Sequence, residues 1–511
     1  MKFTTLTLSV FLTLSGAVLL DETKYRLQLS SYNPVISKLA SKLSTASVGD
    51  VLNSAIFQPL PAESFMESTP WYIKGFRWSE NDPQDDTDNV WSPQSISTSA
   101  DQGSYGGIVD NNSDVVAVSW NDQRNMTGSS SVSGNGVRVT FVRKGSADGI
   151  PKSRAYIHVL LVEPFDDNGK PNFRELANVI SGGLVWRGNW LYITDNQLGL
   201  RVFDLTQIWR VAQGTSIGLS GSDYLGGAYP FVIPQAFTYK TVLPAKVTFE
   251  PASASLDRNS TPPCIVIGES TTPGENSTFA KFPLNNTSNL LASDSKNIST
   301  AVWAYQTNIN HAEGITFARS SFWITSNDGE YINGDVFRWN PGSWADQFSG
   351  MLPPGVQGIS YKPDGDELWI VGSTIGKRYV MALSASMKNG TGVDAGNDAG
   401  SGGGNSTAPS GSTVPAPTGN NNKLSSGAKA GIAVGVLAGV GGLLAGVMVL
   451  LKKRKKAAAQ GHSCTDPAQP ADSGWYMKPE LSCEEQPKQG PRDISEVAEL
   501  PTVPVRKEMQ G

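Results

Sequence analysis

The side chains best placed to do chemistry stand together in the segment His311-Ala312-Glu313-Gly314. An apolar, partly β-branched run follows it at once, so we expect this segment at the entrance of a strand. A carboxylate at such an entrance is costly to bury unless it is paired, bound to a metal or facing water. Glu313 and His311 are therefore our candidate ligand-binding residues, and Glu313 is also the candidate metal ligand. No catalytic residue is assigned.

Composition excludes several other kinds of site. Before residue 430 the chain has two histidines, His158 and His311, and one cysteine, Cys264. Metal sites built from several histidine or cysteine ligands are therefore excluded from this part. Cys264 cannot form an internal disulfide there and opens an apolar run, which predicts a buried, unreactive thiol. With 41 basic and 46 acidic residues, the formal net charge is −5, which does not favour nucleic-acid binding.

Four carboxylates gather in a short acidic segment, at Asp82, Asp85, Asp86 and Asp88. Carboxylate oxygens are ligands that Ca²⁺ prefers. However, Pro83 interrupts the spacing, and no glycine stands where a calcium loop needs one. We therefore expect a solvated acidic loop. The expected cofactor is none, with a divalent cation such as calcium as the alternative.

An internal repeat is the strongest evidence for the fold. Residues 183–204, 314–339 and 358–382 each contain a glycine, a short apolar strand, a second strand and a third. Gly314 and Gly358 are 44 residues apart, a spacing typical of a four-stranded propeller blade. A weaker copy covers 253–282, and a diverged copy covers 95–162.

These units predict an all-β, propeller-like ectodomain with five to six blades, the sixth requiring the N-terminal segment to complete it. The alternative is a β-sandwich whose repetition is coincidental. In the propeller interpretation, one tryptophan in each of the three clear copies should occupy an equivalent buried position. These tryptophans are Trp190, Trp323 and Trp369.

Residues 430–451 predict a single transmembrane helix. This stretch is uncharged, and as a helix it would extend ~33 Å, enough to cross a bilayer. Five cations follow directly, at 452–456, and mark the cytoplasmic end. We therefore expect a type I single-pass membrane protein. Small residues spaced by four allow two helices to pack closely, which predicts a homodimer through this helix. The alternative is that a single transmembrane helix merely tolerates these glycines. These residues are Gly431, Gly435, Gly439, Gly442 and Gly446.

The remaining organisation agrees with that topology. We expect a signal peptide at 1–17, an N-terminal extension at 18–70 with a brief helix near 35–43, and the ectodomain at 71–387. Residues 388–427 have the composition of a disordered Gly/Ser/Thr/Asn-rich stalk, and 452–511 that of a disordered cytoplasmic tail. All the predicted N-glycosylation sites lie between signal and span. They are Asn111, Asn125, Asn259, Asn276, Asn285, Asn286, Asn297, Asn389 and Asn405.

Two motifs carry a resemblance to a known group of proteins. The first is Trp91-Ser-Pro-Gln-Ser-Ile96 with Ser99-Ala-Asp101, and the second runs from Gly182 to Asp195 and on through 199–204. Over roughly residues 71–386 the chain resembles an uncharacterised family of secreted, propeller-like proteins of fungi and filamentous bacteria. That resemblance implies a fold and a compartment but no activity. Ser181 stands where we expect a histidine in relatives.

A second, shorter resemblance concerns the pair Glu313-Gly314. It is similar to the start of gluconolactonase-type propellers, which implies a glutamate that ligates metal, but matching Asn and Asp ligands are not found. The stalk, glycine-rich span and basic stop resemble fungal cell-surface sensors and adhesion proteins in layout.

The expected function is to bind or sense an extracellular or cell-wall ligand without catalysis. We place the protein in the plasma membrane or another secretory-pathway membrane. The alternatives are an ectoenzyme of the hydrolase or lactonase class, acting in the central channel, and a structural cell-wall protein. Residues 214–218 match the Gly-x-Ser-x-Gly motif of a nucleophile elbow. Such an elbow needs an apolar strand before it and an apolar helix after it, and the sequence predicts neither here.

Overall fold

Strands make up most of the described chain. The computed structural model describes residues 17–62, 69–103, 108–109, 113–123, 136–143, 155–269, 276–327, 329 and 331–387. Within these residues the only α-helices are α1 (Val35–Ala40) and α2 (Val48–Asn53). The all-β prediction is therefore confirmed, and a short helix forms where one was expected. No helix in this part of the chain is long and apolar enough to cross a membrane. The predicted signal peptide (apart from residue 17), stalk, transmembrane helix and tail lie outside the described residues.

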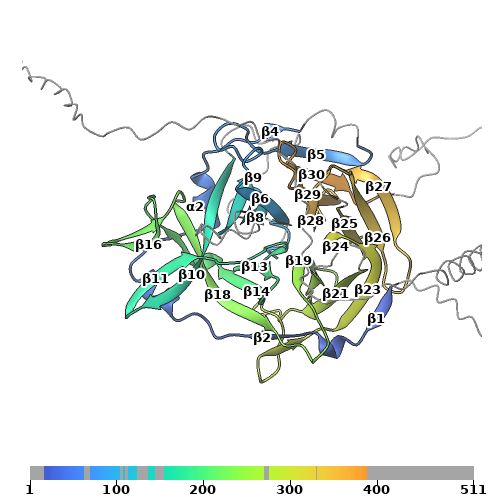
Figure 1. Ribbon diagram of the computed structural model, residues 1–511, viewed down its shortest axis with the longest axis horizontal. Helices are drawn as coiled ribbons and strands as arrows, with labels where there is room; N and C mark the ends of the chain where they lie inside the picture. The colour runs from blue at the N-terminus through green and yellow to red at the C-terminus, as the bar shows by residue number, and fades with distance from the viewer. Residues whose placement is uncertain are drawn as a thin grey trace, which may run out of the picture. The chain divides into compact units, whose positions relative to one another are not determined.

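The strands are arranged around a common centre, as Figure 1 shows, in groups that we call blades one to five. Blades three, four and five are separate sheets, whereas blades one and two belong to one 14-stranded sheet. Blade one consists of β6 (Trp91–Thr98), β8 (Ser113–Asp122), β9 (Val137–Arg143) and β10 (Tyr156–Asp167), with β7 (Ile108–Val109) and β11 (Lys170–Glu175) at its sides. Blade two consists of β12 (Leu184–Arg187), β13 (Trp190–Asp195), β14 (Gly199–Asp204) and β18 (Phe231–Thr241). Blade three consists of β19 (Pro251–Asp257), β20 (Cys264–Glu269), β21 (Asn276–Pro283) and β23 (Trp303–Asn310). The prediction of one blade between the first two clear copies is confirmed.

The last two blades contain the other clear copies of the repeat. Blade four consists of β24 (Ala312–Ala318), β25 (Ser321–Ser326), β26 (Gly334–Trp339) and β27 (Asp346–Leu352). Blade five consists of β28 (Val356–Lys362), β29 (Glu367–Gly372), β30 (Tyr379–Ser384), β5 (Tyr72–Arg77) and β4 (Leu60–Pro61). Because β5 comes from the beginning of the domain and β30 from its end, this blade joins the two ends of the ring.

The innermost strands β6, β12, β19, β24 and β28 form a closed ring in which each contacts the next. The repeated glycine explains how they approach so closely. A Cβ on Gly314 would lie 2.8 Å from the Ile359 nitrogen, and a Cβ on Gly358 would lie 2.8 Å from the Ser95 Cα. Gly183 makes a similar approach to Ala254. The glycine at the start of each copy is therefore required where neighbouring blades meet.

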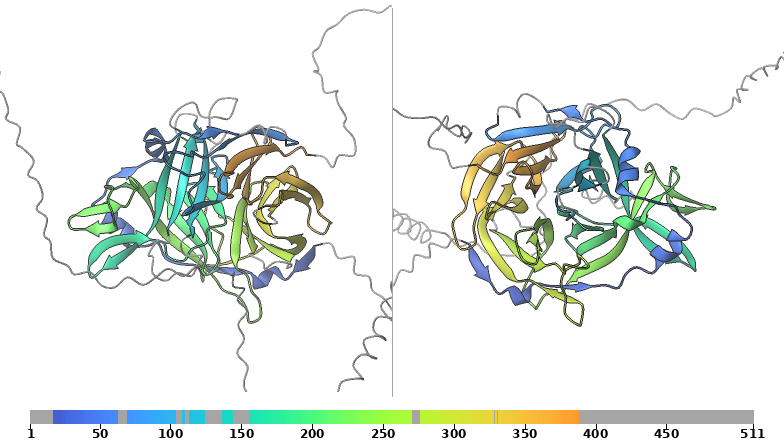
Figure 2. Two further views of the ribbon diagram at one scale, coloured as in Figure 1. Left: turned by 45° about the horizontal axis from the view of Figure 1, so that its top comes forward. Right: turned by 180° about the vertical axis from the view of Figure 1, so that it is seen from behind.

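The described part of the N-terminal extension builds no sixth blade. It runs along the outer side of the sheets, in blue in Figures 1 and 2, and adds edge strands. These are β1 (Val18–Leu20) on blade three, β2 (Arg26–Leu29) on blade two, and β3 (Thr45–Ala46), which pairs with β15 (Ile208–Arg210). Strand β2 also pairs with β22 (Ile298–Thr300). A further departure from separate blades is the parallel pairing of β10 with β18, which joins blades one and two.

The tryptophan prediction is correct in two copies and wrong in the third. Trp323 and Trp369 are each 1% exposed and directly precede the isoleucine that pairs with the innermost strand. In blade two that place belongs to Tyr192, which is fully buried. Trp190 lies two residues earlier, is only half-buried, and donates to the Ser288 carbonyl oxygen. The repeated aromatic position was therefore assigned two residues too early.

Candidate functional site

The starts of the innermost strands define one end of the ring, which we call the mouth, and Glu313 lies there on β24. The ladder between β24 and β25 is irregular between Ala312 and Gly314, so a bulge releases Glu313 from regular pairing. Its side chain is half-buried and has no hydrogen-bond or ion-pair partner among the described residues. Burial raises the pKa of Glu313 to about 7. A titratable carboxyl group without a partner among the described residues thus stands at the mouth.

His311 does not share the strand with Glu313. Its backbone is left-handed, with φ of 53°, and β24 begins one residue later. Its carbonyl oxygen accepts a hydrogen bond from the Asn327 nitrogen at 3.1 Å. The expectation that both side chains point to one face required a strand that had already begun at His311, and the structure does not meet that condition.

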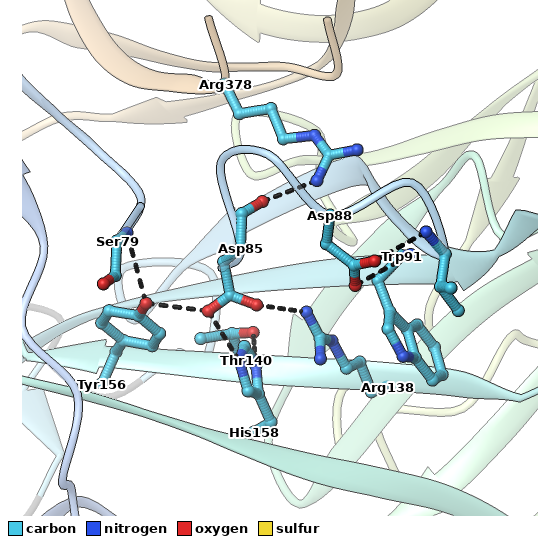
Figure 3. A network of polar contacts seen from close by, with 10 residues as sticks. Ser79, Asp85, Asp88, Trp91, Arg138, Thr140, Tyr156, His158 and Arg378 are labelled. Carbon is cyan, nitrogen blue, oxygen red and sulfur yellow. Dashed lines mark hydrogen bonds and ion pairs between the residues drawn. The ribbon is translucent and has the colours of Figure 1, made fainter. Parts of the chain in front are cut away.

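The acidic segment is not the solvated loop that we expected. Asp85 and Asp86 are 1% and 0% exposed, whereas Asp82 lies at the surface. Figure 3 shows Asp85 at the centre of a polar network, facing side chains from β9 and β10. Asp85 accepts from Arg138 Nη2 at 2.6 Å and from the Tyr156 hydroxyl at 2.8 Å. These partners, unseen in the local pattern, make burial of the carboxylate tolerable.

His158 completes this network in a way that leaves it without a free nitrogen. Its Nε2 lies 2.9 Å from Asp85 Oδ2, and its Nδ1 lies 2.7 Å from Thr140 Oγ1. Burial alone would raise the pKa of Asp85, but His158, Arg138 and Tyr156 hold that pKa well below its usual range. Because burial and Arg138 lower the pKa of His158, we assign the proton to Nε2, which donates to ionised Asp85.

The order Asp85, His158, Thr140 has the connectivity of a nucleophilic triad. However, Thr140 is fully buried between paired strands, and its hydroxyl must donate to the histidine. A substrate carbonyl needs direct access to such a hydroxyl. The arrangement therefore holds blade one to the acidic segment and supplies no nucleophile.

Two arginines extend the network in opposite directions. The guanidinium of Arg138 lies between two indole rings, 4.7 Å from the Trp91 centroid and 4.6 Å from that of Trp120. Arg378, which directly precedes β30, is fully buried and donates to the Asp85 carbonyl oxygen at 2.6 Å and to that of Ser373 at 3.1 Å. The Trp91 motif of the sequence thus packs around a structural ion pair.

The opposite end of the ring is closed by Asp101 from the second part of that motif. Its carboxylate accepts from Ser97 at 2.8 Å, Ser360 at 2.9 Å and Arg258 at 2.6 Å. Ser97 and Ser360 lie on the innermost strands of blades one and five, and Arg258 directly follows the innermost strand of blade three, β19. Asp101 is 3% exposed, so it binds blades together and is not presented to a ligand.

A pocket of about 450 Å³, which we call the mouth pocket, opens between blades four and five. Its wall includes Asn327 and Tyr331 of blade four, Ser373 and Thr374 of blade five, and Arg378. A second pocket of about 250 Å³ lies on the other side of the acidic segment. The sequence indicates neither pocket, because each is lined by residues from distant parts of the chain.

The remaining site predictions divide between described and undescribed residues. Asn259, Asn276, Asn285, Asn286 and Asn297 are exposed. The other sequons, Asn111, Asn125, Asn389 and Asn405, lie outside the described residues. So do the glycines proposed for helix packing, Gly431, Gly435, Gly439, Gly442 and Gly446.

Three further expectations concern single positions. Cys264 is 3% exposed, and burial raises its pKa, so the buried thiol is confirmed. Ser181 is buried and donates to Asn121 Oδ1 at 2.6 Å. Ser216, the serine of the elbow-like letters, lies exposed before the hairpin β16 (Ile217–Ser220) and β17 (Asp223–Gly226). In the part of the chain that the structure describes, no group of three or more His, Cys, Asp or Glu could hold a metal ion.

Comparisons with known proteins assign no activity. No family model matches the chain. No curated protein matches it either. Among solved structures, the GH43_1 enzyme from Xanthomonas citri matches at 8% identity and a TM-score of 0.27, over 66% of this chain and 93% of that one. The Malassezia sympodialis allergen Mala s 1 matches at 10% identity and a TM-score of 0.27, over 59% and 80%. The propeller-like description therefore rests on the strand order and contacts of this chain.

Proposed function

We propose that this protein is a type I single-pass membrane glycoprotein whose propeller-like domain binds or senses an extracellular or cell-wall ligand at the mouth of the ring. The supporting observation is the unpaired carboxyl group of Glu313 on an innermost strand. Structural carboxylates elsewhere in the domain, such as Asp85 and Asp101, have their donors within the protein. A group with a strongly raised pKa and no internal partner is typical of a functional site.

A thermal-unfolding screen tests this function on the full chain in detergent. The defined library contains neutral and acidic oligosaccharides, amino acids, organic acids and divalent cations. A compound that binds the native state raises the melting temperature in proportion to the logarithm of its concentration over Kd. We expect at least one compound to do so, and Glu313→Gln to abolish that shift without lowering the melting temperature of the free protein.

The opposite result assigns Glu313 a structural role. In that case Glu313→Gln lowers the melting temperature of the free protein and leaves every ligand-induced shift as it was. Screening with divalent cations also tests whether Glu313 ligates a metal. A cation-specific shift that disappears in Glu313→Gln would favour the metal site and, with it, an ectoenzyme.

The membrane topology has its own test. Five cations after residue 451 favour a cytoplasmic C-terminus and an external propeller-like domain, in the plasma membrane or another secretory-pathway membrane. Protease added to intact cells should remove the domain and spare the tail. Digestion of the tail with the domain intact would contradict the proposed orientation. Enzymatic removal of N-glycans should lower the apparent mass of the same protein.

A further inference from the structure

The mouth pocket is built from blade loops that lie far apart in the chain. Asn327 follows β25 of blade four, and Tyr331 lies in the turn that leads to β26. Ser373 and Thr374 follow β29 of blade five. Gln123, which directly follows β8 of blade one, also lines the pocket. Three blades therefore contribute to one concave surface beside the channel.

Uncharged hydrogen-bonding groups and apolar surface dominate this wall. Tyr331 is 92% exposed, and Ile375, also in the wall, is 51% exposed. Two amide side chains, Asn327 and Gln123, stand near them. An exposed tyrosine offers a flat apolar face with a polar tip, while amides can both donate and accept. This combination suits a ligand that has an apolar face and many hydroxyl groups.

Arg378 supplies an additional donor in the wall. Its Nη2 has no hydrogen-bond partner among the described residues, although the side chain is fully buried. In Figure 3 one terminal nitrogen is directed at the main chain of Asp85 and the other is directed away from it. Such unpaired buried donors are uncommon in proteins and call for an acceptor.

The surrounding charge distinguishes between a neutral and an acidic ligand. Burial lowers the pKa of Arg378 to about 10, so it is cationic at neutral pH, but Asp88, Asp86 and Asp85 lie close enough to oppose that lowering. Three carboxylates thus offset the charge of the guanidinium. These carboxylates do not line the pocket, but their negative charge weakens the attraction of the guanidinium for an oxyanion, whereas binding of an uncharged hydroxyl group is little affected.

We infer that the mouth pocket binds a sugar ring of an uncharged oligosaccharide, with Tyr331 as the stacking surface and Asn327, Gln123 and Arg378 as hydrogen-bonding groups. This inference rests on the proposed function of the mouth and names its ligand class. The pocket's volume suits a small part of a chain, so the rest of the oligosaccharide extends over the exposed surface around Ile375.

Direct binding measurements test the inference with the full chain in detergent. The probes are neutral oligomers of glucose, xylose, mannose and N-acetylglucosamine, with an oligogalacturonate as the acidic counterpart. Isothermal titration should show saturable binding of at least one neutral oligomer. Tyr331→Ala should weaken it about tenfold through loss of ring contact. Tyr331→Phe keeps the ring and should retain most of the affinity.

A matched control is available in the same blade. Trp344 is another exposed aromatic, 55% exposed, outside the residues that line the pocket. Trp344→Ala should leave binding unchanged. The inference is overturned if no neutral oligomer binds, if only the oligogalacturonate binds, or if Tyr331→Ala and Trp344→Ala have the same effect.

Failure of this inference can be told apart from failure of the proposed function. A ligand whose binding requires Glu313 but is indifferent to Tyr331→Ala overturns the sugar site and leaves the binding function standing. A sugar whose binding requires Tyr331 but is indifferent to Glu313→Gln supports the pocket and removes Glu313 from the ligand site.

Discussion

Asp85 and Glu313 are carboxyl groups in opposite surroundings. Asp85 is enclosed by donors from Arg138, His158 and Tyr156, and its pKa is held low. Glu313 has no partner among the described residues, and burial raises its pKa to about 7. The contacts of Asp85 join the acidic segment to blade one, whereas the carboxyl group of Glu313 remains available at the mouth to bind a ligand or a proton. Pairing, rather than burial, separates the structural carboxylate from the candidate functional one.

The largest expected effect comes from removing Asp85. Asp85→Ala leaves the buried Arg138 and His158 without their acceptor, so the free energy of unfolding should fall by about 3–5 kcal/mol. Denaturant-induced unfolding measures this loss. Asp82→Ala, in the same segment but at the surface, is the matched control and should change stability little. Equal effects of the two substitutions would mean that the network does not stabilise the domain.

Glu313 should instead make stability depend on pH near neutrality. An unfolded glutamate titrates near about 4.3, below its native pKa of about 7. Its contribution is therefore complete below the unfolded pKa and is lost as the pH rises through 7, on the order of 3 kcal/mol. Glu313→Gln should remove this component, so that the variant is the more stable protein at pH 8. Parallel pH profiles of wild type and variant would contradict the unpaired state. For Asp85 the sign is reversed, because its contribution is lost as the pH falls below the unfolded value.

The far end of the ring allows a smaller test of the same contrast. Asp101→Asn keeps the shape of the side chain but removes the charge that faces Arg258. We expect a loss of about 2 kcal/mol, typical of a hydrogen bond to a charged group. Asp166→Asn removes the exposed ion pair with Lys38 but keeps an oxygen that can accept from the Gly169 nitrogen, so it serves as the comparison and should have little effect. A larger loss from Asp166→Asn would exclude Asp101 as a link between blades.

The sequence predicted the strands because the residues that define each copy of the repeat are close together in the chain. Gly314, Ile324 and the 44-residue spacing specify one blade and its neighbour without further information. The partners of the acidic segment could not be found in this way. Asp85 meets Arg138 and His158 across 53 and 73 residues. The pairing of β9 with β10 and the position of the segment between β5 and β6 bring these residues together.

The same limit explains the outcome at the mouth. The sequence placed Glu313 at a strand entrance, because the pattern around it is local, and the structure agrees. It could not show Tyr331 in the same pocket as Ser373, because the loops of blades four and five must first be positioned by their sheets. Nor could it predict the left-handed backbone of His311, which separates this residue from the strand.

Infrared titration of Glu313 tests the central claim most directly. The difference between the spectra of wild type and Glu313→Gln isolates the carboxyl band of this residue in the full chain as the pH is varied. An unpaired carboxyl group enclosed at the mouth should lose its proton with a midpoint near pH 7, consistent with the effect of burial on its pKa. A midpoint near the ordinary glutamate value would contradict the account, because Glu313 would then be solvated or stabilised as a carboxylate by a partner.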